Sequence, residues 1–297
     1  MTEADKRTAR RSAAATWAPL VRFIAADAAI AHWAGKRPLT LALYEFIRFG
    51  LKQGWACLFG GAMVALLIAT SLWDPHGAPL SRYDFLFLAA LAIQVAMLSF
   101  RLETLDEAEV ILIFHIVGTV MELFETAVGS WIYPDAALFR IAGVPLFSGF
   151  MYASIGSYIA RSWRLFDFRF THHPPLWTLF LLAAAIYANF YAHHYVADTR
   201  WALFGVRALL CGRTWIYYKI HHAYRRMPFL LGVFFVSVFI WIAENFGTLT
   251  RTWLYPNQIN GWAMVPLGKL SSWYLLMLTS YVMVAWVNKP QAYRAGE

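Results

Sequence analysis

The stretch Glu122-Leu-Phe-Glu-Thr-Ala-Val-Gly-Ser-Trp-Ile-Tyr-Pro134 has a close copy later in the chain, Glu244-Asn-Phe-Gly-Thr-Leu-Thr-Arg-Thr-Trp-Leu-Tyr-Pro256. In both stretches a carboxylate stands nine residues before a Trp-x-Tyr-Pro turn, and Val-Pro-Leu follows, at 144–146 and 265–267. The repetition and its apolar surroundings predict a duplicated helical hairpin that lies in a membrane. A carboxylate in lipid is costly and is usually retained for a function.

The composition of the 297 residues places most of the chain in lipid. Hydrophobic residues make up 60 %, charged residues 14 %, and the mean hydropathy is +0.50, which is too apolar for a soluble domain of this length. A count of six or seven membrane spans stays open, because the second apolar run is short and the seventh carries a charge. We expect eight spans, at about 54–73, 85–100, 110–131, 142–159, 176–196, 201–220, 229–246 and 262–287.

Basic residues in the connections indicate how the chain is oriented, because short basic loops stay on the cytoplasmic side. With eight spans, the basic N-terminal segment and the fourth-to-fifth and sixth-to-seventh connections fall on one side. We therefore expect a multi-pass protein of the bacterial inner membrane with both termini in the cytoplasm. The net charge of +8 follows from this topology and indicates no nucleic-acid partner. The basic residues of these two connections and of the C-terminal tail are Arg161, Arg164, Arg169, Arg225, Arg226, Lys289 and Arg294.

The expected fold is all-α, with two parallel four-helix membrane halves related by the repeat. Apolar residues between Trp17 and Trp33 gather on one side of a helical wheel, which indicates an amphipathic helix on the inner membrane surface. A disordered tail is the alternative. The expected parts are a cytoplasmic N-terminal segment at 1–47, membrane halves at 48–165 and 166–288, and a cytoplasmic tail at 289–297.

The two glutamates Glu122 and Glu244 are expected near the middle of the membrane. The Trp-x-Tyr-Pro turns mark the outer interface, where Trp and Tyr are favoured. Nine residues of helix then place each carboxylate about 13 Å below that interface. Anchoring of the turn is the simplest role for the aromatic side chains. The expected substrate-binding residues around the glutamates are Thr126, Thr248, Arg213, Asn245, Trp131, Trp253, Tyr133 and Tyr255.

Charged groups at this depth must be paired or neutralised, because each costs about 3 kcal/mol on insertion scales. Lys269 and Arg207 are expected at nearly the depth of the glutamates, so we predict that each glutamate bonds to one of these cations. In one interpretation this network only fixes how the helices pack. In the other, a glutamate held between a cation and apolar walls transfers protons to a lipid-soluble substrate. The expected catalytic residues are then Glu122, Glu244, Lys269, Arg207, His193 and His194.

Three tandem histidine pairs raise the question of a metal site, although the sequence assigns no cofactor. The pair His193 and His194 is expected on the outer side, beside the glutamates, and the other two pairs on the inner side. Adjacent histidines on a helix point about 100° apart, unlike the i,i+4 pairs of helical metal sites, so contact with lipid headgroups is the simpler role. If a metal is bound, the candidate ligands are His115, His172, His173, His221 and His222.

Several longer motifs resemble one bacterial family of integral membrane proteins. They are Lys52-Gln53 with Ala56-Cys-Leu-Phe-Gly60, Gly129-Ser-Trp-Ile-Tyr-Pro134, Val144-Pro-Leu-Phe-Ser-Gly-Phe-Met-Tyr-Ala153, Trp241-Ile-Ala-Glu-Asn245 and Tyr255-Pro-Asn-Gln258. Over about residues 45–288 the chain resembles the family labelled domain of unknown function 817. That resemblance implies a multi-pass inner-membrane protein and supplies no activity. The family favours Gly where this chain has Arg251, which puts close helix packing at that turn in doubt.

A weaker resemblance runs to the membrane carotenoid cyclases and hydratases, which protonate polyene double bonds. Their repeats similarly set a Glu before a Gly-x-x-x-Trp turn and follow it with a Pro-Leu segment. The cyclases carry paired acids after that proline, whereas this chain has Phe147-Ser148 and Gly268-Lys269 there. Carotenoid cyclisation is therefore not expected.

Three functions remain open from the sequence. The leading hypothesis is a membrane-embedded enzyme that acts on a lipid or isoprenoid, with Glu122 and Glu244 as acid and base. A secondary transporter or ion-coupled carrier is the first alternative, because of the repeat and the charges at mid-depth. A structural or assembly role is the second, favoured if the polar network is fully paired. The expected partners are the lipid bilayer and a hydrophobic small molecule.

Overall fold

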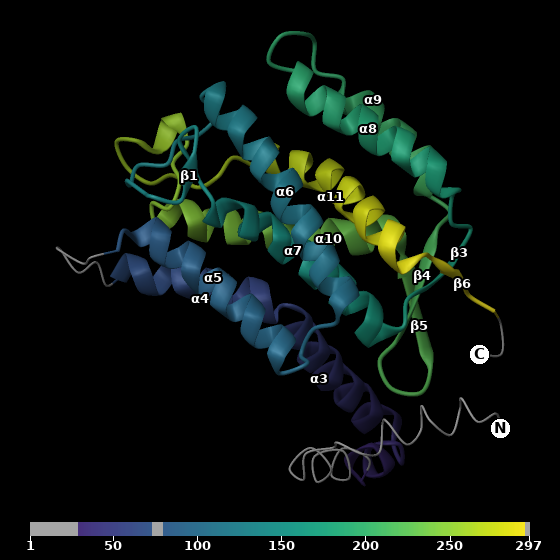
Figure 1. The fold of residues 1–297 in the computed structure, drawn as a ribbon. Helices are drawn as coiled ribbons and strands as arrows, with labels where there is room; N and C mark the ends of the chain where they lie inside the picture. Colours follow the sequence, from purple (N-terminus) through teal and green to yellow (C-terminus); the bar gives the residue numbers. More distant parts are fainter. Residues whose placement is uncertain (1–28, 73–79, 295–297) are drawn as a thin grey trace. The chain divides into compact units, whose positions relative to one another are not determined.

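The computed structural model describes residues 29–72 and 80–294, and most of them are helical (Figure 1). The amphipathic helix predicted from Trp17 onward lies largely outside the described residues. The chain divides into two compact units, Met1–Leu51 and Lys52–Glu297, and the second contains the helices from α4 to α11. The helices are α3 (Pro38–Ala56), α4 (Leu58–Leu72), α5 (Arg82–Ser99), α6 (Leu105–Ala127), α7 (Phe147–Phe166), α8 (Leu176–Ala192), α9 (Arg200–Cys211), α10 (Phe229–Leu249) and α11 (Leu267–Asn288), with a short 3-10 turn η1 (Pro256–Gln258).

Local chemistry explains where the central helices begin. The hydroxyl of Thr104 accepts the backbone N–H of Glu107 at 3.2 Å, and the Glu107 carboxylate accepts the backbone N–H of Thr104 at 2.9 Å, which forms a capping box at the start of α6. Helices α10 and α11 follow Pro228 and Pro266 directly. A proline is tolerated there because its missing N–H would have no partner within the first helical turn.

Four helices of the described chain, α5, α6, α10 and α11, are long and apolar enough to cross a membrane. The pair α3 and α4 would add a fifth if it forms one broken span, and α8 is apolar but shorter. Helix α7 carries Arg161, which is fully buried and donates to Glu103 at 2.8 Å. The structure therefore shows several helices able to span a membrane, while the count of eight stays a prediction.

The prediction of a helix through the whole sixth span is wrong in its second half. Helix α9 ends at Cys211, and residues 215–219 form strand β4. This strand belongs to a four-stranded sheet in the order β5-β4-β3-β6, so the fold is mostly helical rather than all-α. Strand β4 pairs antiparallel with β5 and β3, and β3 pairs parallel with β6. The strands are β1 (Arg140–Ile141), β2 (Val144–Pro145), β3 (Arg169–Thr171), β4 (Trp215–Lys219), β5 (Tyr224–Pro228) and β6 (Gln291–Ala292).

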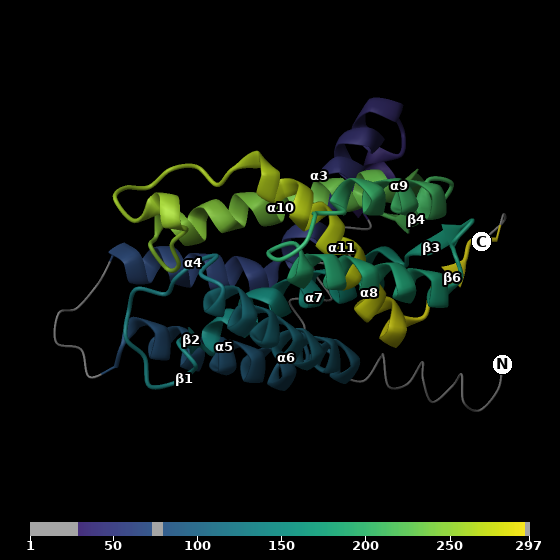
Figure 2. The same cartoon turned by 90° about the horizontal axis from the view of Figure 1, so that it is seen from above.

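The connections of the second unit gather at two ends (Figure 2). At the hairpin end lie the α6–α7 and α10–α11 connections, which are joined by a β-bridge between Ile132 and Leu254. At the sheet end lie the α7–α8 connection, the α9–α10 connection and the residues after α11, which are joined in the four-stranded sheet. The names hairpin end and sheet end are kept below.

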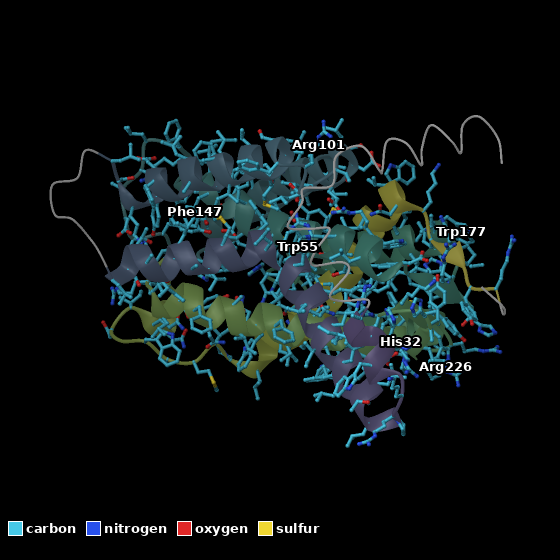
Figure 3. The ribbon with its side chains drawn as sticks, turned by 90° about the horizontal axis from the view of Figure 1, so that it is seen from below. His32, Trp55, Arg101, Phe147, Trp177 and Arg226 are labelled. Atoms are coloured by element: carbon cyan, nitrogen blue, oxygen red, sulfur yellow. The ribbon has the colours of Figure 1, made fainter. Side chains whose placement is uncertain are left out.

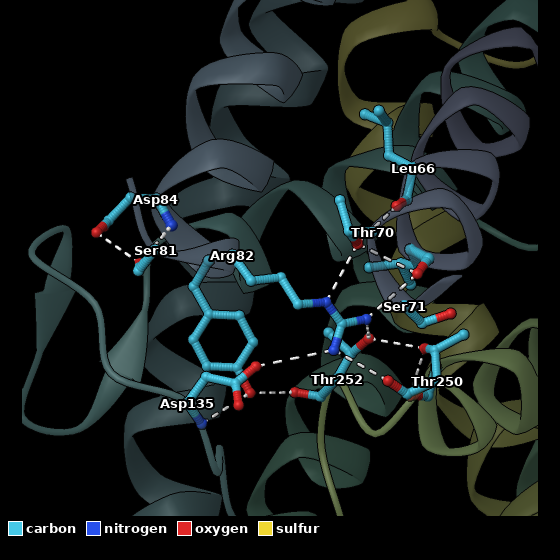
Figure 4. A network of polar contacts seen from close by, with 12 residues as sticks. Leu66, Thr70, Ser71, Ser81, Arg82, Asp84, Asp135, Thr250 and Thr252 are labelled. Atoms are coloured by element: carbon cyan, nitrogen blue, oxygen red, sulfur yellow. Dashed lines mark hydrogen bonds and ion pairs between the residues drawn. The ribbon is translucent and has the colours of Figure 1, made fainter. Parts of the chain in front are cut away.

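Arg82, in the first turn of α5, ties that helix to the hairpin end (Figure 4). Its guanidinium donates to the carbonyl of Thr250 at 3.0 Å and to the hydroxyl of Thr252 at 3.1 Å, and it lies 3.8 Å from the carboxylate of Asp135. The carboxylate of Asp84 accepts backbone N–H groups of the α6–α7 connection at 2.8 and 3.0 Å. Helix α5 thereby holds both connections of the hairpin end.

Helices α6 and α7 approach closely because glycines face large side chains of the partner helix. A Cβ atom on Gly118 would lie 2.6 Å from the ring of Tyr152. Large apolar side chains also cover the outside of the bundle, as on Leu112, Ile116 and Val120 of α6, which are 54 to 58 % exposed. Figure 3 shows side chains of this kind around the ribbon, with Trp177 toward the sheet end. An apolar exterior is what a lipid environment requires.

Candidate functional site

The carboxylate of Glu122 is buried on α6 and accepts three hydrogen bonds from aromatic side chains. The indole N–H of Trp131 donates at 2.7 Å and the hydroxyl of Tyr133 at 2.5 Å, both to Oε2. The hydroxyl of Tyr152, on α7, donates to Oε1 at 2.7 Å. These donors satisfy both carboxylate oxygens without a neighbouring cation.

Glu244 is held in a similar way on α10. The hydroxyl of Tyr255 donates to Oε1, and the indole N–H of Trp273, on α11, donates to Oε2 at 2.7 Å. Tyr152 and Trp273 occupy corresponding positions, each eight residues after the Val of a Val-Pro-Leu motif. Their rings lie 6.3 Å apart, measured between centroids. Each glutamate therefore receives donors from its own turn, two for Glu122 and one for Glu244, and one further donor from the following helix.

The two turns meet each other at equivalent positions. The backbone N–H of Ile132 donates to the carbonyl of Leu254 at 2.9 Å, and the N–H of Leu254 donates back at 3.0 Å. The ring of Trp131 packs edge-on against that of Tyr255, with 6.0 Å between centroids. The two glutamate sites are thus parts of one buried polar cluster at the hairpin end.

The predicted pairing of the glutamates with Lys269 and Arg207 is wrong for the described residues. The ammonium of Lys269 lies over the rings of Trp131 and Tyr255, at 5.1 and 4.8 Å from their centroids. Arg207 lies over the ring of Tyr274 at 3.9 Å and donates to the carbonyl of the same residue. A similar expected depth along two helices does not show which neighbouring side chain reaches the carboxylate first.

Lys269 is nevertheless linked to both glutamates through one aromatic ring each. Glu122 accepts the indole N–H of Trp131, and Glu244 accepts the hydroxyl of Tyr255. These are the two rings beneath the ammonium of Lys269. A carboxylate that accepts a hydrogen bond from an aromatic ring increases electron density on that ring, which favours the cation on its face.

The other residues predicted to bind a substrate differ in their surroundings. Asn245 accepts the backbone N–H of Val265 at 2.9 Å, and Thr248 accepts the indole N–H of Trp262 at 3.2 Å. The hydroxyl of Thr126 is buried and makes no hydrogen bond with the part of the chain that the structure describes. Arg213 lies exposed in the α9–β4 connection, at the sheet end.

The second Trp of the repeat has a packing role. Trp253 lies against Gly247, where a Cβ atom would come within 2.0 Å of the indole ring. The close packing that Arg251 put in doubt is therefore present, and Arg251 accommodates it with a left-handed backbone at φ +54°. Trp131 donates to its glutamate, whereas Glu244 takes its indole donor from Trp273 instead.

A cavity of about 300 Å³ opens beside this cluster, between α6, α8 and α11. Glu125, one helical turn after Glu122, lines it and is only 2 % exposed. Among residues 29–72 and 80–294 its oxygen Oε1 has no hydrogen-bond partner, and Nε2 of His194 lies 3.6 Å away, beyond hydrogen-bond distance. The lining also includes Ser130, Ile186, Asn189, Phe190, His193, Arg200, Pro266, Gly268, Lys269, Ser272, Leu275 and Leu276.

The charged groups of the cavity differ in how they are balanced. Arg200 donates to Asp198 at 2.7 Å, and the amide of Asn189 donates to the same carboxylate at 3.1 Å. Burial raises the pKa of Asp198, but hydrogen bonds from the Arg200 backbone and from Asn189 together lower it by more than burial raises it. The pKa of Asp198 therefore lies below its ordinary value. Asp198 is therefore ionised at neutral pH and balances Arg200. Glu125 instead faces the imidazole of His194, 3.6 Å away, and Lys269 lies over aromatic rings rather than beside a carboxylate.

The histidines proposed as metal ligands are distributed over the structure. His193 lines the cavity, and its Nδ1 lies 2.7 Å from the carbonyl of Phe190. In the described part of the chain, no group of three or more His, Cys, Asp or Glu side chains could hold a metal ion. His115, on α6, packs against Phe150 of α7, and His172 and His173 precede α8. His221 and His222 lie between β4 and β5, with ring centroids 3.7 Å apart.

Sequence reasoning missed Glu125, Tyr152 and Trp273 as members of the site. A signal was present for each of them. Glu125 lies three residues after Glu122, which places both on neighbouring parts of one helical face. Tyr152 and Trp273 share their distance from the Val-Pro-Leu motif, so the repeat already marked them as equivalent.

Apolar helices around a buried polar cluster define this chain as an α-helical protein with several helices able to cross a membrane. It belongs to the family described as protein of unknown function (DUF817), whose model matches residues 45–281. It is 42 % identical over 244 residues to the uncharacterised protein YoaT of Bacillus subtilis (strain 168). The aligned region covers 82 % of this chain and 92 % of YoaT. No solved structure matches the chain. The family predicted from the motifs is confirmed, and the comparisons give no support to the likeness to carotenoid cyclases.

Proposed function

We propose that this protein is a multi-pass enzyme of the bacterial inner membrane that acts on a lipid or isoprenoid by proton transfer. The cavity at the hairpin end carries the proposal. There, a buried oxygen of Glu125 has no hydrogen-bond partner, and Lys269 lines the same space. A carboxylate and an ammonium group that face one cavity are suited to acid–base chemistry on a bound ligand.

The roles of the charged residues follow from their contacts. Glu125 is the proton-transferring group, and Lys269 stabilises negative charge that develops on the ligand. Glu122 and Glu244, which the sequence favoured as acid and base, already accept hydrogen bonds at both oxygens. We assign them a positioning role, because each holds one of the two rings over which Lys269 lies.

The orientation is part of the same proposal. The hairpin end faces the outer side and the sheet end the cytoplasm, in an arrangement of eight helices that arose by duplication. Two observations support it. The connections predicted to be cytoplasmic come together in one sheet, and the two Trp-x-Tyr-Pro turns pair with each other at the opposite end.

Comparison of membrane lipids tests the proposed activity. A strain that lacks the gene is complemented with the wild type, with Glu125→Gln, or with Glu109→Gln, a matched change at an exposed position of the same helix. The wild type and Glu109→Gln should restore the lipid profile. Glu125→Gln should reduce the product by about a hundredfold or more, because a positioned acid or base contributes about that factor. Equal restoration by both variants, at equal amounts of protein in the membrane, would refute the proposal.

A structural or assembly role is the second candidate, and the glutamate cluster favours it. All four oxygens of Glu122 and Glu244 accept a hydrogen bond. On this alternative, Glu122→Gln lowers thermal stability while Glu125→Gln leaves the lipid profile unchanged. An ion-coupled carrier instead predicts solute uptake into proteoliposomes that is lost in Glu125→Gln and kept in Glu109→Gln.

A further inference from the structure

A second, smaller cavity lies beside the first one, farther along α6 and α11 from the hairpin end. Its volume is about 20 Å³, and it lies deeper in the bundle, between α6, α7, α8 and α11. Leu276 lines both cavities, and the neighbouring residues Ile186 and Tyr187 of α8 line one each. The remaining lining is Phe114, Val117, Gly118, Met121, Tyr152, Ile155, Trp273, Ser280 and Met283.

The two cavities share Leu276, and we call them together the groove, with a polar part beside Glu125 and an apolar part beside Gly118. Along α6 it reaches from Glu125 to Phe114, about 16 Å at 1.5 Å per residue. The polar part is wide, whereas the apolar part is narrow and is bordered by Met121 and Met283. Methionine side chains adapt easily to a ligand. At about 20 Å³ this part would admit one slim apolar chain only if these side chains move aside, and it excludes two chains or a ring system.

The polar part of the groove indicates which head group would accompany an apolar chain bound in the narrow part. Oε1 of Glu125 accepts no hydrogen bond from the described residues, and Nε2 of His194 lies 3.6 Å away, so a hydrogen-bond donor on a ligand would stabilise this buried oxygen. The ammonium of Lys269 offers donors and requires an acceptor. A hydroxyl group meets both demands at once, whereas a carboxylate would face Glu125 with like charge.

We propose that this groove binds a single-chain lipid whose polar head carries hydroxyl groups, with the head between Glu125 and Lys269 and the chain along Leu276 toward Gly118. This inference rests on the proposed function, because it takes the same cavity as the ligand site. It adds the class of substrate, a neutral hydroxylated lipid.

Photolabelling of the full chain in nanodiscs tests the path of the lipid chain. The probe is a monoacylglycerol with a diazirine near the end of its acyl chain, and labelled peptides are identified by mass spectrometry. Labels are expected on the segments of α6, α8 and α11 that line the smaller cavity. Val117→Trp should abolish them by filling the groove, whereas Val120→Trp, on the 55 % exposed side of the same helix, should leave them unchanged. If Val117→Trp does not fold, Leu276→Phe replaces it.

A second probe tests the polar head. The fatty acid with the same diazirine chain should label the wild type about tenfold less than the monoacylglycerol does, which is the expected loss of a hydrogen bond to a charged group. In Glu125→Gln this preference should largely disappear, and in Glu109→Gln it should remain. Equal labelling by the two probes in the wild type, or equal effects of the two Trp variants, would overturn the inference.

The two proposals can fail separately. A lipid profile that depends on Glu125, together with no preference for the hydroxylated head, would refute the substrate class and leave the enzyme intact. Specific labelling in the groove, with a lipid profile that does not depend on Glu125, would refute the enzyme and leave a lipid-binding site.

Discussion

At position 251 an arginine occupies a backbone conformation that favours glycine. The φ angle of Arg251 is +54°, and that of Gly129, the equivalent position of the first stretch, is +76°. A left-handed backbone costs a residue with a Cβ atom about 1–2 kcal/mol. The first stretch avoids this cost and the second does not.

Replacement of Arg251 by Gly should therefore stabilise the protein. We expect the free energy of unfolding to rise by about 1 kcal/mol, because relief of the backbone outweighs the greater freedom of glycine in the unfolded chain. The measurement is the midpoint of thermal unfolding in detergent. Gly129→Ala is the converse control and should lower that midpoint. An unchanged midpoint in both variants would contradict the explanation.

At the scale of single residues, the sequence identified the buried acids but not their partners. Glu122 and Glu244 were recognisable because they interrupt apolar runs at matched depth. Their donors could not be predicted, because spacing along the chain is the same for Trp131 and Trp253, yet only Trp131 bonds to its glutamate. Lateral contacts between helices decide this difference.

At the scale of elements, the contact between α6 and α7 is set by Gly118. A methyl group there would lie 2.6 Å from the ring of Tyr152, the donor to Glu122. Gly118→Ala should lower the free energy of unfolding by about 1–3 kcal/mol, because the overpacked helices must separate. Gly61→Ala, in α4, is the control, since a Cβ atom at Gly61 meets nothing within 4 Å. Equal thermal midpoints for the two variants would show that the contact is not tight.

The connection between β3 and α8 contains a histidine that should make stability depend on pH. Burial lowers the pKa of His173, whose Nε2 lies 2.7 Å from the hydroxyl of Tyr281. The unfolded chain, with an ordinary pKa of about 6.5, then binds a proton more readily than the folded one. Stability should be full above that value and fall as the pH decreases below it. In His173→Gln the thermal midpoint should decrease less between pH 7 and 5, and an identical decrease would contradict this assignment.

Apolar runs located the helices well, because the hydrophobic length of a span is a strong constraint. The same signal failed after Cys211. Residues 215–219, Trp-Ile-Tyr-Tyr-Lys, continue the apolar run but are aromatic and β-branched, which suits a strand equally well. One partner strand, β5, lies in the same connection, but the other, β3, comes from the α7–α8 connection, so the sheet could not be predicted from one segment alone.

At the scale of the whole molecule, the two ends of the bundle should lie on opposite sides of the membrane. In a chain whose native cysteines are replaced by Ala, Leu138→Cys marks the hairpin end and His222→Cys the sheet end, and both positions are exposed. A membrane-impermeant maleimide should label Leu138→Cys on intact spheroplasts. It should label His222→Cys only after the membrane is opened. Labelling of both from the same side would contradict the topology.

The bridge between Ile132 and Leu254 has a consequence for biosynthesis. The backbone groups of Ile132 find their partner only when the final part of the chain has been made. At bacterial elongation rates this leaves roughly ten seconds during which the first turn has emerged from the ribosome and the second has not. During that interval the early half must wait in the translocation machinery or bind a chaperone. A prematurely terminated chain would keep that half incomplete and become a substrate for membrane proteases.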